Sequence, residues 1–250
     1  MPLLPEGHPE KIFREDGLRL DGRKIDDLRD LRIEIGVLKN ADGSAMVCHG
    51  KNRIIAGAYG PREVHPRHLA QSDTGILQVQ YRMATFSVGE RKTPVPGRRE
   101  KEISMVIQHA LEPVLFLEQY PNTTIDIFIQ VMTADGGTRC ASITAAALAL
   151  ADMGIPMRDL VTGVAVGKVD NKIILDLADY EDKWEENAAD MPVAVMMNEK
   201  KITLLQLDGQ VGVDEFEQML NLALKGGEKI YALQKEALRK KYTSELVGGR

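Results

Sequence analysis

The sequence TADGGTRCASITAAALAL at residues 133–150 places two glycines, a threonine and an arginine between a strand pattern and an alanine-rich helical stretch. Gly136 and Gly137 allow positive φ values and let a ligand approach the backbone closely. The helix that follows has unpaired N–H groups and a dipole that favour an anion. Thr138 adds a hydroxyl donor, and Arg139 adds a fork that matches phosphate oxygens. The pattern suits a phosphate site, but it also fits a plain strand-to-helix turn capped by Thr138.

Basic residues gather at two other places in the chain. The segment from Arg91 to Lys101 contains Arg98 and Arg99, which follow a Pro-Gly pair and precede a predicted helix. Two adjacent arginines can bind successive phosphates of a single nucleic-acid strand, whereas the commoner alternative for a charge run is a loop that only faces water. A second polar group has the same two interpretations and consists of Arg62, His65, Arg67 and His68.

An acidic group follows a predicted strand in the sequence LDLADYEDKWEENAADMPV. Carboxylates at a strand end can hold Mg²⁺ through one or two oxygens, or act as general acid or base. The alternative is a solvated acidic loop. The acidic residues are Asp176, Asp179, Glu181, Asp182, Glu185, Glu186 and Asp190. Together with a phosphate site and an arginine pair, such carboxylates supply what phosphoryl transfer between two anions needs.

The predicted elements place these groups at strand ends and helix starts. Apolar alternation predicts strands, and apolar recurrence at helical spacing predicts helices. In the first half the strands lie near 33–37, 46–48, 54–58, 77–83 and 125–131, and the helices cover 103–114 and 138–153. The stretch GAYGPREVHPRHLAQSDTG at 57–75 is typical of a long loop. In the second half the strands lie near 161–169 and 172–177, joined by a hairpin turn at Asp170-Asn171, and near 193–197 and 202–207. A long amphipathic helix follows from about 216, with a suggested kink at Gly226-Gly227. Two series of strands that each end in a helix predict an α+β fold with mixed sheets covered by helices.

The totals describe one soluble globular chain of 250 residues, with 44% apolar and 28% charged residues. We expect a single domain over 18–241, a flexible arm at 1–17 and a tail at 242–250. The formal net charge of −5 argues against general binding to duplex DNA, but not against a local basic channel. Two distant cysteines and the lack of an apolar leader or span predict a cytoplasmic chain without disulfides, zinc or membrane contact.

Four motifs resemble those of the RNase PH family of phosphorolytic 3′→5′ exoribonucleases, in the same order along the chain. They are RLDGR at 19–23, GRRE at 97–100, DGGTR at 135–139 and ED…ADM at 181–191. The resemblance covers roughly residues 18–240. The sequences YGPREVHPRH and ERKTPVPGRRE are more similar to the catalytic RNase PH-type subunit of the archaeal exosome than to the bacterial stand-alone enzyme. The resemblance implies an RNase PH-like β-α-β-α fold.

The resemblance also implies roles for individual residues. Gly137, Thr138 and Arg139 would bind the inorganic phosphate that attacks the last phosphodiester. Residues implied to bind RNA are Arg98 and Arg99 near the 3′ end and Arg67 along the RNA path. Asp182 would be the principal catalytic carboxylate, with Asp190 as general acid to the departing 3′ oxygen, and either could be a ligand of Mg²⁺. The insertion KWEENAA spaces these two aspartates more widely than is usual in the family.

The implied assembly is a hexameric ring, in which three copies alternate with an inactive RNase PH-type paralogue beneath RNA-binding cap subunits. Its activity would convert single-stranded RNA to nucleoside diphosphates, and excess diphosphate would drive the reverse, tailing reaction. Two alternatives stand beside this one. A non-catalytic RNA-binding ring subunit would lack the arginine pair, the phosphate turn or the catalytic aspartate, and this chain has all three. A hydrolytic nuclease with two Mg²⁺ ions would release monophosphates and ignore added phosphate.

Overall fold

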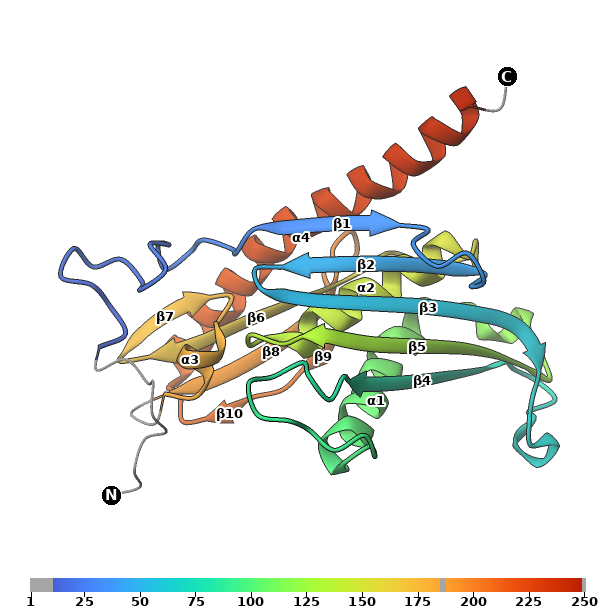
Figure 1. Cartoon of the computed structure of the whole chain (residues 1–250), viewed down its shortest axis with the longest axis horizontal. Coiled ribbons are helices and arrows are strands. Elements are labelled where there is room, and N and C mark those ends of the chain that lie inside the picture. Colours follow the sequence, from blue (N-terminus) through green and yellow to red (C-terminus); the bar gives the residue numbers. More distant parts are fainter. Residues whose placement is uncertain (1–10, 185–187, 249–250) are drawn as a thin grey trace.

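The computed structural model describes residues 11–184 and 188–248 of the chain. This part forms two sheets packed with helices, which confirms the predicted α+β class, although only the first sheet is mixed and the second is antiparallel throughout (Figure 1). The first sheet comes from residues before the alanine-rich helix, and the second comes from residues after it. The candidate phosphate turn at the start of that helix therefore lies at the junction of the two halves.

The first sheet has the strand order β1-β2-β3-β5-β4 and is antiparallel except for the parallel pair β4–β5. Its strands are β1 (Leu31–Ile35), β2 (Gly43–His49), β3 (Asn52–Glu63), β4 (Ile76–Met83) and β5 (Thr123–Thr133). The strand β3 runs into a segment that the sequence assigns to a loop. A register shift between Tyr59 and Arg62 absorbs the Gly-Pro pair there, so that pairing with β5 continues beyond it.

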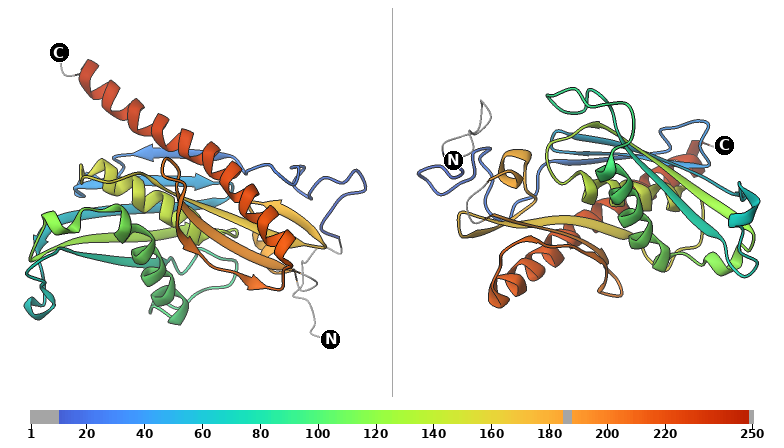
Figure 2. Two further views of the ribbon diagram at one scale, coloured as in Figure 1. Left: turned by 180° about the vertical axis from the view of Figure 1, so that it is seen from behind. Right: turned by 90° about the horizontal axis from the view of Figure 1, so that it is seen from below.

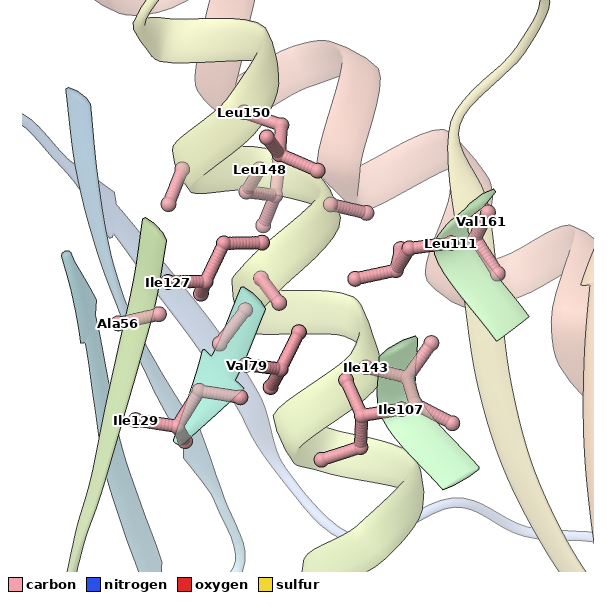
Figure 3. Close-up of a cluster of buried hydrophobic side chains, with 14 of the residues drawn as sticks. Ala56, Val79, Ile107, Leu111, Ile127, Ile129, Ile143, Leu148, Leu150 and Val161 are labelled. Carbon is pink, nitrogen blue, oxygen red and sulfur yellow. The ribbon is translucent and has the colours of Figure 1, made fainter. Parts of the chain in front are cut away.

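The helix α2 (Thr138–Asp152) lies between the two sheets and contacts β2, β3 and β6. Its residues are buried on all sides, because the run of alanines and leucines offers no polar face. Figure 3 shows Ile143 and Leu148 among apolar side chains of the strand β5 and of the helix α1 (Arg98–Leu111). The helix α1 covers β4 and connects it to β5, as the parallel pair requires. The start of α2 is thus held by a rigid core.

The second sheet has the order β10-β8-β6-β7, and β9 also pairs with β8. Its strands are β6 (Val161–Val169), β7 (Lys172–Leu175), β8 (Ala189–Met196), β9 (Lys201–Leu205) and β10 (Asp208–Gly209). The predicted hairpin turn between β6 and β7 is confirmed, since Asp170 and Asn171 both have positive φ, at 48° and 58°. The strand β8 begins earlier than predicted, at Ala189, and so includes Asp190.

The helix α4 (Val213–Gly248) packs on the face of the second sheet that is turned away from α2 (Figure 2). It runs without interruption through Gly226 and Gly227, where the sequence suggests a kink, and over most of the expected tail. A Cβ atom at Gly226 would lie 2.6 Å from the Leu175 side chain, so the glycine permits close packing instead. No helix in the described part is long and apolar enough to cross a membrane.

The remaining elements are short. The 3₁₀ turns are η1 (Arg67–Leu69), η2 (Glu112–Val114) and η3 (Leu117–Gln119), and α3 (Asp179–Asp182) is a single helical turn after β7. Of the expected N-terminal arm, residues 1–10 lie outside the described residues, as do Glu185 and Glu186 of the acidic group. Ile12 is buried against β6 and β7 in a small apolar cluster, so this part of the arm packs on the domain.

Candidate active site at the glycine turn

The glycine turn joins the end of β5 to the start of α2. Gly136 and Gly137 have φ values of 72° and 66°, a region that L side chains rarely adopt. A Cβ atom at Gly136 would lie 2.7 Å from the backbone of Ala178, so the turn passes directly against the segment before α3. The sequence suggested Thr138 as the helix cap, but in the structure the cap is Gly137. The Thr138 hydroxyl instead accepts a hydrogen bond from the buried Tyr81 hydroxyl at 3.0 Å. Its own proton is therefore available to a ligand.

A set of buried polar groups holds this turn from behind. The Asn52 amide donates to the Gly136 carbonyl and accepts from the Asp135 N–H, both at 2.6 Å. The Arg29 guanidinium donates to the carbonyls of Asp135 and Gly136. It also pairs with buried Asp176 at 2.6 Å. Burial alone would raise the pKa of Asp176, but the charge and hydrogen bonds of Arg29, with Nε2 of His49 at 3.0 Å, hold this pKa well below its ordinary value. Asp176 is therefore a structural anion rather than a catalytic acid.

The RLDGR motif positions α3. Arg19 is fully buried, and its guanidinium donates to Glu181 at 2.7 Å and to the Leu175 carbonyl at 2.6 Å. Glu181 in turn accepts from the N–H of Ala178 at 2.7 Å, which caps α3. Glu181 is thus occupied within the fold, while its neighbour Asp182 is exposed. The sequence did not separate these two roles.

Two adjoining cavities, of ≈ 670 Å³ and ≈ 800 Å³, lie in front of the turn. The first is bordered by the glycine turn with Thr138, and the second by Arg98 and the β9–β10 segment. Both cavities are lined by Arg99, Arg139, Asp182, Asp190 and Pro192. The structure therefore brings the predicted phosphate turn, the arginine pair and the two aspartates to one place, although they come from four different elements.

Arg67 is the exception among the predicted site residues. It belongs to η1, near the end of the first sheet opposite α3 (Figure 1). Its side chain is 79% exposed and pairs with Glu63 at 2.9 Å. It lines neither cavity within the described residues. An RNA role for Arg67 stays a prediction, and it would concern a part of the strand distant from the cavities.

The cations of the site come from two helix starts. Arg99 lies in the first turn of α1, where Glu100 accepts from the N–H groups of Gly97 at 2.7 Å and Met83 at 3.1 Å. These bonds fix the first turn of α1 next to the end of β4. Arg139 lies in the first turn of α2 and donates to the side chain of Gln206. Lys92 also lines the first cavity, and sequence reasoning did not single out its role there.

The two aspartates differ in their electrostatics. Burial, and then the charge of Asp182, raise the pKa of Asp190 to about 7, although Arg139 acts in the opposite direction. Partial removal from water also raises the pKa of Asp182, although its side chain reaches the cavity, and the charge of Arg99 opposes that rise. A carboxyl with a pKa near neutrality can carry a proton to a leaving group at physiological pH. Asp190 has that property.

The same pair of carboxylates fits a divalent cation. Within the described residues no group of three or more His, Cys, Asp or Glu side chains forms a metal site. Mg²⁺ is often held by one or two carboxylates together with substrate phosphates and water. Asp182 and Asp190 repel each other strongly enough to shift a pKa, so a cation shared by them would be stabilised. The donor set therefore fits Mg²⁺ bound together with a phosphate substrate.

Two family models together match most of the chain between residues 27 and 226. The model of the 3′ exoribonuclease family, domain 1 (RNase PH), matches residues 27–156, and that of domain 2 of the same family matches residues 159–226. The chain is 57% identical to "Exosome complex component Rrp41" of Thermococcus onnurineus over 247 residues, which cover 97% of this chain and 98% of that protein. It is 54% identical to the protein of the same name of Methanopyrus kandleri, over 95% of this chain and 98% of that protein.

Solved structures share the fold at lower identity. Rice Rrp46 superimposes with a TM-score of 0.79 and 23% identity, covering 88% of this chain and 100% of that one. A chain of the Archaeoglobus fulgidus exosome with RNA bound to the active site gives a TM-score of 0.73 at 22% identity, covering 91% and 93%. At these identities the two structures support the fold alone.

Proposed function

Because the chain belongs to the RNase PH family of 3′ exoribonucleases, we propose that it shortens single-stranded RNA from the 3′ end by phosphorolysis. The observation that carries this proposal is the meeting of Arg99, Arg139, Asp182 and Asp190 on the shared wall of two cavities. One cavity contains the glycine turn, which suits inorganic phosphate. The other contains Arg98, which suits the RNA strand. Two anions can therefore be held side by side in front of a pair of acids.

The glycine turn would hold the attacking phosphate. Phosphate is a poor nucleophile toward an anionic diester, because the two repel each other. The guanidinium of Arg139, the Thr138 hydroxyl and the N–H groups at the start of α2 would offset that repulsion. The buried contacts of Arg29 and Asn52 keep the turn in one conformation, so that no reorganisation is needed when phosphate binds.

The reaction forms one phosphorus–oxygen bond, breaks another, and requires one proton for the leaving oxygen. A phosphate oxygen attacks the phosphorus of the last phosphodiester, and the bond from that phosphorus to the 3′ oxygen of the preceding nucleotide breaks. Asp190 would give its proton to the departing 3′ oxygen, and the last nucleotide leaves as a nucleoside diphosphate. Arg98 and Arg99 would hold the RNA backbone. Asp182 would hold Mg²⁺, which would supply charge stabilisation at the phosphates when bound; Asp190 would be a ligand only in its ionised form, as the alternative to its role as acid.

No high-energy bond is lost in this exchange, so the reaction is reversible. Excess nucleoside diphosphate would extend RNA at the same site. We also propose that the chain acts within a hexameric ring, three copies alternating with an inactive RNase PH-type paralogue under RNA-binding caps. Support for the ring comes from the 57% identity to an exosome component over almost the whole chain.

Product identity tests the proposal. The chain, alone and with its paralogue, is incubated with 3′-tailed single-stranded RNA and Mg²⁺, with and without inorganic phosphate. We expect nucleoside diphosphates only when phosphate is present. Monophosphates that appear without phosphate would indicate a hydrolase and would contradict the proposal. An absence of products in every mixture would indicate a non-catalytic RNA-binding subunit.

A further inference from the structure

Gln206 lies in the short link between β9 and β10 and lines the second cavity. Its backbone N–H donates to the Pro192 carbonyl at 3.1 Å, which ties the link to β8. Its side-chain oxygen accepts a hydrogen bond from Nη1 of Arg139 at 2.5 Å. Gln206 therefore connects Arg139 of α2, which is predicted to bind phosphate, to β8, the strand that carries Asp190.

The partner of the half-buried Arg139 is unlike those of the two buried arginines. Arg19 and Arg29 each pair with a buried carboxylate, of Glu181 and Asp176. In the described part of the chain Arg139 forms no ion pair, and its buried Nε atom has no hydrogen-bond partner. Its hydrogen bond to Gln206 is with a neutral amide. The guanidinium is consequently oriented by the fold without an ion pair to a carboxylate, and Asp182 and Asp190 act on its charge only at longer range.

We infer that Gln206 is a positioning residue, which aims the Arg139 guanidinium at the phosphate site without cancelling its charge. This role rests on the proposed function, because it assumes that Arg139 binds inorganic phosphate. A free arginine side chain must lose rotamer freedom when it grips an anion, and a hydrogen bond formed beforehand reduces that loss. A carboxylate at position 206 would orient the guanidinium equally well. It would also place a negative charge beside the entering phosphate.

Two substitutions separate orientation from charge. Gln206→Met has similar volume but no acceptor, so Arg139 keeps its charge and loses its fixed direction. We expect the KM for phosphate to rise about tenfold, the order expected for one hydrogen bond to a charged group. The KM for RNA and the kcat at saturating phosphate should change little. Gln206→Glu keeps an acceptor but compensates the charge, and it should raise the KM for phosphate at least as much.

The control is Gln80→Met, an exposed glutamine of β4 that lines neither cavity. It should leave both KM values unchanged. A double-mutant cycle with Arg139→Lys adds a readout that a general loss of structure would not move. If Gln206 acts through the guanidinium, Gln206→Met should add little to the KM for phosphate of the Arg139→Lys enzyme. The rise in Tm that phosphate gives the wild type should shrink in the Gln206→Met protein.

The outcomes distinguish the two proposals. If the wild type depends on phosphate and Gln206→Met leaves its KM for phosphate unchanged, the positioning role is wrong while phosphorolysis stands. An equal rise in the KM for RNA would also overturn the role, and would make Gln206 an RNA contact. A Gln206→Glu enzyme with wild-type KM for phosphate would refute the importance of the neutral amide. A wild type that ignores phosphate would overturn both proposals.

Discussion

Asp190 combines two properties that a general acid needs, a place beside the candidate phosphate arginine and a pKa raised to about 7 by burial and by Asp182. The protonated form is the active one if Asp190 protonates the leaving oxygen. We therefore expect kcat to fall as the pH rises through about 7. Asp190→Asn should lower kcat by about 10²–10⁴-fold and remove this limb from the pH profile. Single-turnover rates between pH 5.5 and 9 measure both effects.

Variation of Mg²⁺ separates the acid role from a ligand role. A metal ligand must be ionised. If Asp190 is a ligand of Mg²⁺, the rate should rise with pH, and this rising part of the pH profile should move to lower pH as the Mg²⁺ concentration increases. That result would assign Asp190 to the metal. A limb that persists in Asp190→Asn and disappears in Asp182→Asn would exchange the roles of the two residues.

The same shift predicts a change in stability that does not depend on activity. The pKa of Asp190 in the fold is about 7, above the ordinary value of 3.8, so the ionised form is disfavoured in the folded chain. Stability contributed by this group is complete at low pH and is lost as the pH rises toward 7. At pH 8 Asp190→Asn should therefore raise the free energy of unfolding by on the order of 4 kcal/mol, and at pH 4 the two proteins should be nearly equal. Urea unfolding at the two pH values checks the sign.

Asp182 is expected to act in turnover and not in RNA binding. Asp182→Asn removes a negative charge from the wall of both cavities, so the Kd for RNA should stay equal or decrease slightly. Turnover should be lost. Asp179→Asn is a matched control in the same helical turn, because Asp179 lines only the first cavity and pairs with Lys183 at 2.6 Å. Fluorescence anisotropy with RNA and single-turnover assays separate the two effects. Undiminished turnover in Asp182→Asn would overturn the assignment.

At the scale of elements, α3 depends on a contact that spans most of the sequence. Arg19 and Glu181 are both fully buried and pair with each other. Glu181→Ala would leave a buried guanidinium without its carboxylate, and we expect it to lower the free energy of unfolding by about 3–5 kcal/mol. Asp179→Ala, in an exposed ion pair, should cost less than about 1 kcal/mol. Denaturant midpoints of the two variants test this, and equal midpoints would mean that Arg19 does not hold α3.

The position of α3 depends on residues far away in the sequence, and such long-range contacts explain why the sequence predicted the helices and strands better than the site. Apolar periodicity located α2, and the Asp170-Asn171 turn followed from local backbone preference. The residue types of Arg98, Arg139 and Asp182 suggested one phosphoryl-transfer chemistry, but only the family resemblance assigned the three residues to a single site. The sequence did not predict the buried polar residues that hold the site in place. Arg19, Arg29 and Asn52 are polar residues with no period, and their partners at Glu181, Asp176 and Gly136 are 84 to 162 residues away.

At the scale of the whole molecule, a chain of net charge −5 must bind RNA through a local surface. Arg98 and Arg99 at the start of α1 border the second cavity, beside the acids that would act on the 3′ end. Each phosphate contact to a single strand releases counterions and contributes about −0.7 to the slope of log K against log salt. Arg67, at the distant end of the first sheet, would add a contact farther along the strand.

We therefore expect Arg98→Gln with Arg99→Gln to weaken RNA binding and to reduce the magnitude of the salt slope by about 1.4, the loss of two contacts. The matched control is Arg32→Gln with Arg239→Gln, which removes the same net charge from β1 and α4, away from both cavities. Titrations of a single-stranded RNA at several salt concentrations give both slopes. If the two double variants lose slope equally, the RNA responds to the net charge of the molecule. If only the first does, its phosphates lie against the start of α1, where the second cavity opens beside Asp182 and Asp190.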